Sequence, residues 1–298
     1  MSDKTTIHEL SNGFAAAVEA AGASVVRVEA RHRRASSGIV WSADGVIATA
    51  DHKVEREEDI RVGLAGGREV PATLVGRDPR TDVAVLRAEA TGLAAPTWAA
   101  DADLKVGHLA FALSRPGKDV RASLGIVCAL GEGWRTHAGG RIDRWIETDV
   151  VHQPGFTGGL LIDAAGRGLG MDDAGLRRGR GLALPASTLR RVVEAILAHG
   201  GVRRGYLGIA VQPVRLPESA AAAHGATGLI VVAVQPGGPA EQAGLLLGDV
   251  IVALDGRPAA DPGALQEILD EDRVGKEIAL SVLRGGEARE VRATVGAR

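Results

Sequence analysis

Hydrophobic positions in the first two thirds of the chain fall into many short runs separated by turn residues. Early runs cover residues 24–29, 38–41, 46–50, 60–64, 69–76 and 83–87, and later ones cover 108–114, 121–129, 144–148, 159–162 and 168–171. Gly, Asp and Pro separate them, as in Ala43-Asp44-Gly45. Many short strands with frequent turns are typical of an all-β barrel or sandwich, and the pattern predicts such a fold here.

Two segments have helical spacing instead. Residues 12–22 (NGFAAAVEAAG) are Ala-rich and predict a short N-terminal helix. A second helix is expected after Pro185, with Ser187 as its N-cap, because apolar residues recur at helical intervals from Leu189 to Leu197. Gly200 is expected to end it.

The strand pattern restarts after a basic linker. Strands are expected over 205–214, 228–234, 249–254, 277–284 and 290–295, with one helical turn at 240–243 and a helix at 262–271. Just under 100 residues of this kind have the size of a small binding module. The sequence therefore predicts two domains, residues 1–202 and 203–298.

Composition narrows the class of protein. The 298 residues carry a net charge of −2, so no overall field attracts nucleic acid. No apolar stretch is long enough for a membrane span. Cys128 is the only cysteine, and MSDKTTIHEL has no apolar signal core, so we expect a cytoplasmic protein, or an extracytoplasmic one if a leader was removed. No cofactor or metal site is expected.

Three short motifs occur in a fixed order. They are Thr49-Ala-Asp-His52, Thr81-Asp82-Val-Ala-Val-Leu86 and Gly155-Phe-Thr157-Gly-Gly. Together they resemble the HtrA family of trypsin-like proteases, in which the third motif reads Gly-x-Ser-Gly-Gly. The resemblance runs from about residue 24 to the end. It implies a mostly β fold, a trypsin-like double β-barrel followed by a PDZ domain.

The resemblance also implies catalytic roles. His52 corresponds to the general base and Asp82 to the carboxylate that orients it, because a hydroxyl nucleophile needs a base near neutral pH. Thr157 stands at the nucleophile position. The backbone N–H groups of Gly155 and Thr157 correspond to the oxyanion hole.

The third motif departs from the family pattern. Thr157 adds a β-methyl group to a crowded site and restricts χ1, so we expect weak or absent cleavage. Phe156 and Leu160 replace a common Asn and Pro. Three interpretations stay open: a serine-type endopeptidase with impaired activity, a pseudoprotease that binds peptides as a chaperone, sensor or assembly subunit, or an engineered Ser→Thr variant.

Two segments bear on specificity. The segment Val150-Val151-His152 before the motif offers no carboxylate for a pocket base, and GLALP at 181–185 resembles the opposite wall. A shallow apolar pocket for small aliphatic side chains is the expectation. The basic segment 172–180 is expected to be a solvated turn rather than a regulatory loop.

The C-terminal domain implies a peptide site. Arg204-Gly-Tyr-Leu-Gly-Ile209 resembles the carboxylate-binding loop of a PDZ domain. The candidate peptide-binding residues are Tyr206, Leu207, Gly208, Ile209, Leu265 and Leu269. Leu265 and Leu269 are expected either in the groove wall or in the core. The implied partners are unfolded polypeptides or peptide C-termini.

The family resemblance further implies a homotrimer assembled through N-terminal segments. Residues 12–22, including Phe14, are the candidates for the trimer contact. The short segment 31–37 argues against a larger cage.

Overall fold

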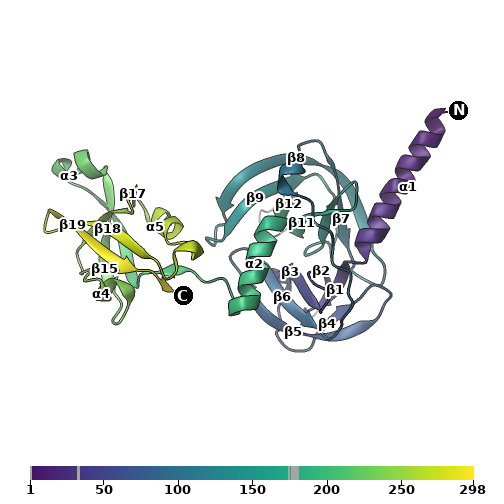
Figure 1. The fold of residues 1–298 in the computed structure, drawn as a ribbon, viewed down its shortest axis with the longest axis horizontal. Helices are drawn as coiled ribbons and strands as arrows, with labels where there is room; N and C mark the ends of the chain where they lie inside the picture. Colours follow the sequence, from purple (N-terminus) through teal and green to yellow (C-terminus); the bar gives the residue numbers. More distant parts are fainter. Residues whose placement is uncertain (1, 32–33, 174, 176–180) are drawn as a thin grey trace. The chain divides into compact units, whose positions relative to one another are not determined.

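The structure is a computed structural model that describes residues 2–31, 34–173, 175 and 181–298. It divides into two compact units, Met1–Gly201 and Val202–Arg298, each considered by itself (Figure 1). Strands dominate both units, as the sequence pattern predicts.

The first six strands of the N-terminal unit close into a barrel in the order β1-β2-β3-β6-β5-β4. Their bounds are β1 Val25–Glu29, β2 Ser36–Val40, β3 Val46–Ala50, β4 Ile60–Gly63, β5 Glu69–Asp78 and β6 Val83–Ala88. The interior is packed with Val, Ile, Leu and Ala side chains. These small, mostly β-branched residues suit a narrow barrel lumen.

A second barrel follows, closed in the order β10-β11-β12-β9-β8-β7. Its strands are β7 Leu109–Ser114, β8 Arg121–Arg135, β9 Arg141–Thr148, β10 Leu160–Asp163, β11 Gly168–Asp173 and β12 Gly181–Pro185. The β8–β9 pair is longer than expected and continues to Arg135 opposite Arg141. Gly131 lets the pair continue, because a Cβ there would lie 1.8 Å from the indole nitrogen of Trp145.

Helix α1 (Ser2–Gly22) starts ten residues earlier than predicted. Its last turns are anchored, since the Phe14 ring lies 5.3 Å from that of Phe111 and the Arg115 guanidinium donates to the Gly22 carbonyl oxygen at 2.8 Å. Its early turns project away from the barrels (Figure 1). The residues before position 12 are mostly polar, so their pattern did not predict these helical turns. No described helix is long and apolar enough to cross a bilayer.

Helix α2 (Ala186–His199) packs against strands of both barrels. The predicted N-cap, Ser187, is wrong: Pro185 occupies the cap position, and the buried Ser187 hydroxyl has no partner in the described part of the chain. The ring of proline fixes φ at a value suited to a helix start, and proline has no backbone N–H that needs an acceptor. Thr188, not Ser187, makes a side-chain hydrogen bond at this helix start. Its Oγ1 accepts from the Asp143 N–H at 3.0 Å. Gly200 ends the helix at φ 75°, as predicted.

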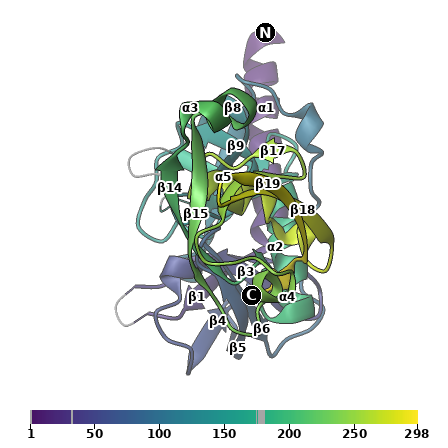
Figure 2. The same cartoon turned by 90° about the vertical axis from the view of Figure 1, so that its left-hand side faces the viewer.

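The C-terminal unit contains a six-stranded sheet whose main order is β14-β15-β16-β18-β19, with β14 at one edge (Figure 2). The bounds are β14 Ile209–Arg215, β15 Thr227–Val234, β16 Val250–Leu254, β18 Glu277–Arg284 and β19 Glu287–Thr294. Short strands β13 (Gly205–Tyr206) and β20 (Gly296–Ala297) pair beside it, and β17 (Arg257–Pro258) pairs with β16.

Two features of this unit differ from expectation. The predicted strand over 205–214 is interrupted at Leu207 and Gly208, because Gly208 has φ +78° and cannot continue an extended strand. Helix α3 (Glu218–His224) was not predicted. Helix α4 (Pro239–Gln242) is shifted one residue toward the N-terminus from the predicted turn, and α5 (Pro262–Ile268) starts as predicted but ends three residues early.

Candidate active site

Strand register in the first barrel brings His52 and Asp82 together. Ala50, the last residue of β3, pairs with Val83, the first residue of β6. His52 follows β3 on a short 3₁₀ turn, η1 (Asp51–Lys53), and Asp82 precedes β6. The Thr81 hydroxyl donates to the Asp78 carboxylate at 2.7 Å and braces the turn that carries Asp82.

The two side chains make a two-point contact. The His52 backbone N–H donates to Asp82 Oδ1 at 2.8 Å, and His52 Nδ1 lies 2.5 Å from Oδ2. Burial alone would raise the pKa of Asp82, but the hydrogen bonds from His52 outweigh it and hold that pKa below its usual value. The carboxylate is therefore ionised near neutral pH and fixes the imidazole tautomer with the proton on Nδ1.

Ser37 ties the loop of residues 155–159 to the first barrel. Its Oγ donates to the Gly155 carbonyl at 2.7 Å, and its backbone N–H donates to the Thr157 carbonyl at 3.2 Å. The sequence reasoning missed Ser37, which lies 118 residues from Gly155 and has no motif around it. A Cβ on Gly158 would lie 2.3 Å from the Ser37 carbonyl oxygen, so only glycine fits there.

The loop presents two backbone donors. Gly155 has φ +96°, a conformation that favours glycine, and its carbonyl is held by Ser37. In the described part of the chain, the N–H groups of Gly155 and Thr157 donate to no protein acceptor. Two unused N–H groups from one tight loop can hold an anionic oxygen.

Thr157 is 7% exposed. Its hydroxyl makes no hydrogen bond to His52 among the described residues. The two unusual neighbours are core residues, since Phe156 is packed in the interior of the second barrel and Leu160 is fully buried on β10. Both replacements therefore act on packing.

The segment before the loop carries no carboxylate of its own, but one from another strand lies beside it. His152 Nε2 lies 2.6 Å from Oδ1 of Asp172, which is 1% exposed. Gly181 borders the same imidazole, because a Cβ there would lie 3.0 Å from His152 Cε1. Asp172 belongs to β11, so inspection of the segment before the loop could not reveal it. The predicted basic turn, with Arg177, lies mostly outside the described residues.

A second carboxylate lies behind His52. Asp173, the last residue of β11, is fully buried, and His52, Asp82 and Asp173 each place one side-chain nitrogen or oxygen within 4.8 Å of the others. The sequence reasoning missed Asp173, because the adjacent acidic pair in Met171-Asp172-Asp173 looks like the start of a polar loop.

The C-terminal unit offers a separate candidate site at the break between β13 and β14. The N–H groups of Leu207 and Gly208 donate to no acceptor in the described chain, while the Gly208 carbonyl accepts from the Gln235 N–H at 2.7 Å. The Tyr206 hydroxyl donates to Gln235 Oε1. Ile209 then begins edge strand β14, so free donors and an open sheet edge are adjacent.

Leu265 and Leu269 are 6% and 8% exposed and belong to the core of this unit. Their burial favours the core alternative for both. Helix α5, which carries Leu265, contacts β14 and therefore lies beside the open edge.

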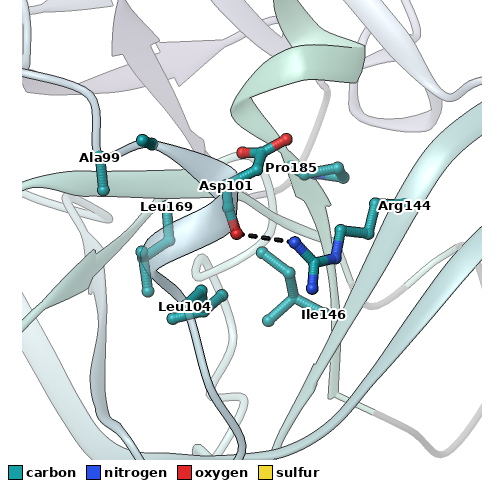
Figure 3. A pocket seen from close by; sticks show the side chains of 8 residues that line it. Ala99, Asp101, Leu104, Arg144, Ile146, Leu169 and Pro185 are labelled. Atoms are coloured by element: carbon teal, nitrogen blue, oxygen red, sulfur yellow. Dashed lines mark hydrogen bonds between the residues drawn. The ribbon is translucent and has the colours of Figure 1, made fainter.

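A small hollow on the second barrel is a poor alternative site (Figure 3). Its walls include Leu104, Ile146, Leu169 and Pro185, and its volume is about 10 Å³, room for roughly one water molecule. The Arg144 side chain at its rim already donates to the Asp101 carbonyl at 2.7 Å. The hollow is too small for a peptide.

Comparison with known proteins agrees with this geometry. The trypsin-like peptidase domain family matches residues 36–171, and the PDZ domain family matches 205–295. A probable periplasmic serine endoprotease, DegP-like, of Halomonas elongata is 36% identical over 271 residues, which cover 89% of this chain and 56% of that protein. Protease Do-like 1, chloroplastic, of Arabidopsis thaliana is 34% identical, with coverage of 87% and 63%. The chain thus spans about half the length of the curated relatives it matches.

Solved structures match nearly the full chain. The HtrA-type protease AlgW with decapeptide has 30% identity and a TM-score of 0.74, with 96% of this chain and 98% of that chain covered. A serine endoprotease from Yersinia pestis has 29% identity, a TM-score of 0.74 and the same coverage. The predicted double barrel followed by a PDZ domain is confirmed. The chain belongs to the HtrA/Deg family of trypsin-like serine proteases that carry a PDZ domain.

Proposed function

We propose that the N-terminal unit is an endopeptidase site for protein quality control whose activity Thr157 makes weak or absent. His52 is the general base, and Asp82 orients it through the 2.5 Å contact between Oδ2 and Nδ1. The N–H groups of Gly155 and Thr157 form the oxyanion hole. This hydrogen-bonded His–Asp pair beside a loop with two free donors is the observation that carries the proposal.

The expected loss of activity comes from the extra methyl group of threonine. A serine hydroxyl turns freely to face a base, whereas a threonine side chain is restricted at χ1 and brings its methyl into the space around the attacking oxygen. A displacement of about 1 Å from the attack geometry costs roughly 10²-fold in rate. The missing hydrogen bond between the Thr157 hydroxyl and His52 in the described structure agrees with this reasoning.

The same missing bond favours a second function, a pseudoprotease that binds peptides without cutting them. The PDZ unit keeps free N–H donors at Leu207 and Gly208 and an open edge at β14. These features suit the C-terminus of an unfolded polypeptide. The solved AlgW complex with a decapeptide supports peptide binding in this family. Two locations were expected, cytoplasmic and extracytoplasmic. The relatives described as periplasmic support the extracytoplasmic one.

Cleavage of casein by wild type, Thr157→Ser and Thr157→Ala tests the two functions. We expect weak or undetectable cleavage by wild type, an increase of at least about 10²-fold in Thr157→Ser, and no cleavage by Thr157→Ala. Asp82→Asn in the Thr157→Ser background is the control for a triad mechanism and should lower the rate again. If Thr157→Ser stays inactive, the pseudoprotease function is favoured; ordinary protease rates in wild type would refute the steric argument.

A further inference from the structure

The carboxyl group of Asp173 has no counterpart in the proposed mechanism. It is fully buried at the end of β11. Oδ1 accepts the Gly175 N–H at 2.7 Å, but Oδ2 has no hydrogen-bond donor in the described part of the chain. A buried anionic oxygen without a donor is costly, so this side chain requires an explanation.

The position of Asp173 beside Asp82 explains its unpartnered oxygen. The two carboxyl groups lie in the same cluster with His52, within 4.8 Å of one another. A buried and a half-buried carboxylate this close repel each other, and the usual outcome is that they share one proton. One of the pair is then a neutral acid that donates a hydrogen bond to the other.

The hydrogen bonds decide which group keeps the proton. Asp82 faces His52 with both oxygens, at 2.8 Å to the backbone nitrogen and 2.5 Å to Nδ1, so its anion is well stabilised. Asp173 receives a single N–H from Gly175. Burial, and then the charge of Asp82, raise the pKa of Asp173 well above its usual value, whereas the pKa of Asp82 is lowered.

We propose that Asp173 is a protonated positioning residue, whose carboxyl O–H donates to the carboxylate of Asp82 and holds it against His52. This inference rests on the proposed function only in taking Asp82 as the orienting carboxylate. The bond satisfies the unpartnered oxygen of Asp173. It also keeps Asp82 ionised in a buried setting by adding a further donor.

The cluster is filled by protein, which argues against a metal ion there. Asp82 and His52 are already in contact, and a Cβ on Gly175 would lie 2.8 Å from His52 Cε1 and 2.9 Å from Asp82 Oδ2. The glycine backbone therefore closes over the pair. A proton fits the available space, and a coordinated cation does not.

The other charged groups around Asp173 leave the proton in place. Among the described residues, Lys53 on η1 places a positive charge near Asp173, and the pKa of Lys53 is itself lowered, chiefly by burial. Asp172, the preceding residue, adds negative charge and pairs with His152 instead. Asp82 adds a second negative charge, and His52 lies in the same cluster.

Carbon-13 NMR of the protein labelled at aspartate carboxyl carbons tests the proposal without any need for cleavage. The Asp173 resonance is the one lost in Asp173→Asn, and Asp103→Asn, at an exposed site, is the matched control. We expect Asp173 to titrate well above the ordinary aspartate range, and its midpoint to fall toward that range in Asp82→Asn. Titration of Asp173 within the ordinary aspartate range in wild type would overturn the proposal.

The proton NMR signal of His52 Nδ1–H shows whether Asp173 positions Asp82 against His52. In proton NMR it should give a far-downfield signal in wild type and in Asp173→Asn, because the amide still donates to Asp82. In Asp173→Leu, which has similar size and no donor, the signal should shift upfield or disappear. An unchanged signal in Asp173→Leu would show that Asp173 does not position Asp82, whatever the outcome of the casein assay.

Urea unfolding adds an independent check if Asp82→Asn folds poorly. The folded pKa of Asp173 lies above its unfolded value, so the wild type loses stability as pH rises from the unfolded value through the folded one. Asp173→Asn lacks this titration. We expect the urea midpoint of wild type to fall relative to Asp173→Asn over that pH range, and parallel midpoints would refute a raised pKa.

Discussion

His152 and Asp172 form a buried acid–imidazole pair next to the loop that carries Thr157. The Asp172 carbonyl accepts from Gly158 N–H at 2.8 Å, and its own N–H donates to the Gly159 carbonyl at 2.8 Å. Its side chain holds His152 at 2.6 Å. Asp172 therefore fixes the loop on both sides, through its main chain after Thr157 and through His152 before it.

Removal of His152 should destabilise the protein. The hydrogen bond that His152 donates to the Asp172 carboxylate is the main reason that the pKa of His152 is raised, while burial raises the pKa of Asp172. In His152→Ala the buried carboxylate loses its partner, and we expect a loss of about 1–3 kcal/mol in the free energy of unfolding. The contribution of His152 is fully present below its unfolded pKa and is lost as pH rises through its folded pKa.

Urea titrations at several pH values measure this effect. Asp172→Asn in the His152→Ala background is the matched control and should recover most of the lost stability, because it removes the unpaired charge. A pH-independent loss in His152→Ala would mean that packing, rather than the ion pair, accounts for it.

Among the secondary-structure elements, β14 lies at an open edge of its sheet. It begins at Ile209, directly after the free N–H groups of Leu207 and Gly208. A peptide that adds to this edge would place its terminal carboxylate at those donors. The positive φ of Gly208, +78°, turns the chain between β13 and β14 at this point.

Peptides with a free C-terminal carboxylate and an aliphatic last residue should bind this unit more tightly than their amides. Amidation removes the anion that the donors satisfy, and we expect it to weaken binding by about 1–3 kcal/mol. Isothermal titration calorimetry with matched acid and amide peptides measures the difference. Equal affinities would rule out the carboxylate site.

The variant Gly208→Ala tests whether the backbone at Gly208 is responsible for the preference for acid peptides over amides. Its φ disfavours a side chain, so the donors should shift and the acid–amide difference should shrink. Gly225→Ala is the control, because Gly225 also has a positive φ, +90°, and lies at the end of α3. Loss of the preference in both variants would indicate general unfolding instead.

At the scale of the whole molecule, the early turns of α1 expose apolar side chains. Ile7 and Leu10 are 69% and 56% exposed on its projecting turns. Phe14, a candidate for the trimer contact, packs on Phe111 of the same chain. The exposed apolar residues earlier in the helix are therefore the better candidates for a contact between chains.

We expect a homotrimer that depends on these residues. Light scattering at micromolar concentration should give the mass of three 30.7 kDa chains. The double variant Ile7→Glu, Leu10→Glu should give the mass of one chain, because charges replace the apolar contact. Val106→Glu, at a 60% exposed site on the N-terminal unit, is the control and should stay trimeric. A wild-type monomer would exclude the assembly.

Local patterns in the sequence determined the elements and the order of the motifs. The strands Val46–Ala50 and Glu277–Arg284 have the bounds that alternation and turn residues predict, and Gly200 ends α2. These features depend on neighbours a few positions apart, which periodicity and backbone preference report directly. The resemblance identified the segments that carry His52 and Thr157 for the same reason, since each motif is contiguous.

Tertiary structure decided which side chains meet. Ser37 reaches Gly155 across 118 residues, and β11 brings Asp172 to His152 and Asp173 to Asp82. The burial of Leu265 and the break at Gly208 were equally beyond local patterns. Such contacts depend on strand register and on closure of the barrels, so they exist only once distant strands have paired, and no spacing along the chain records them.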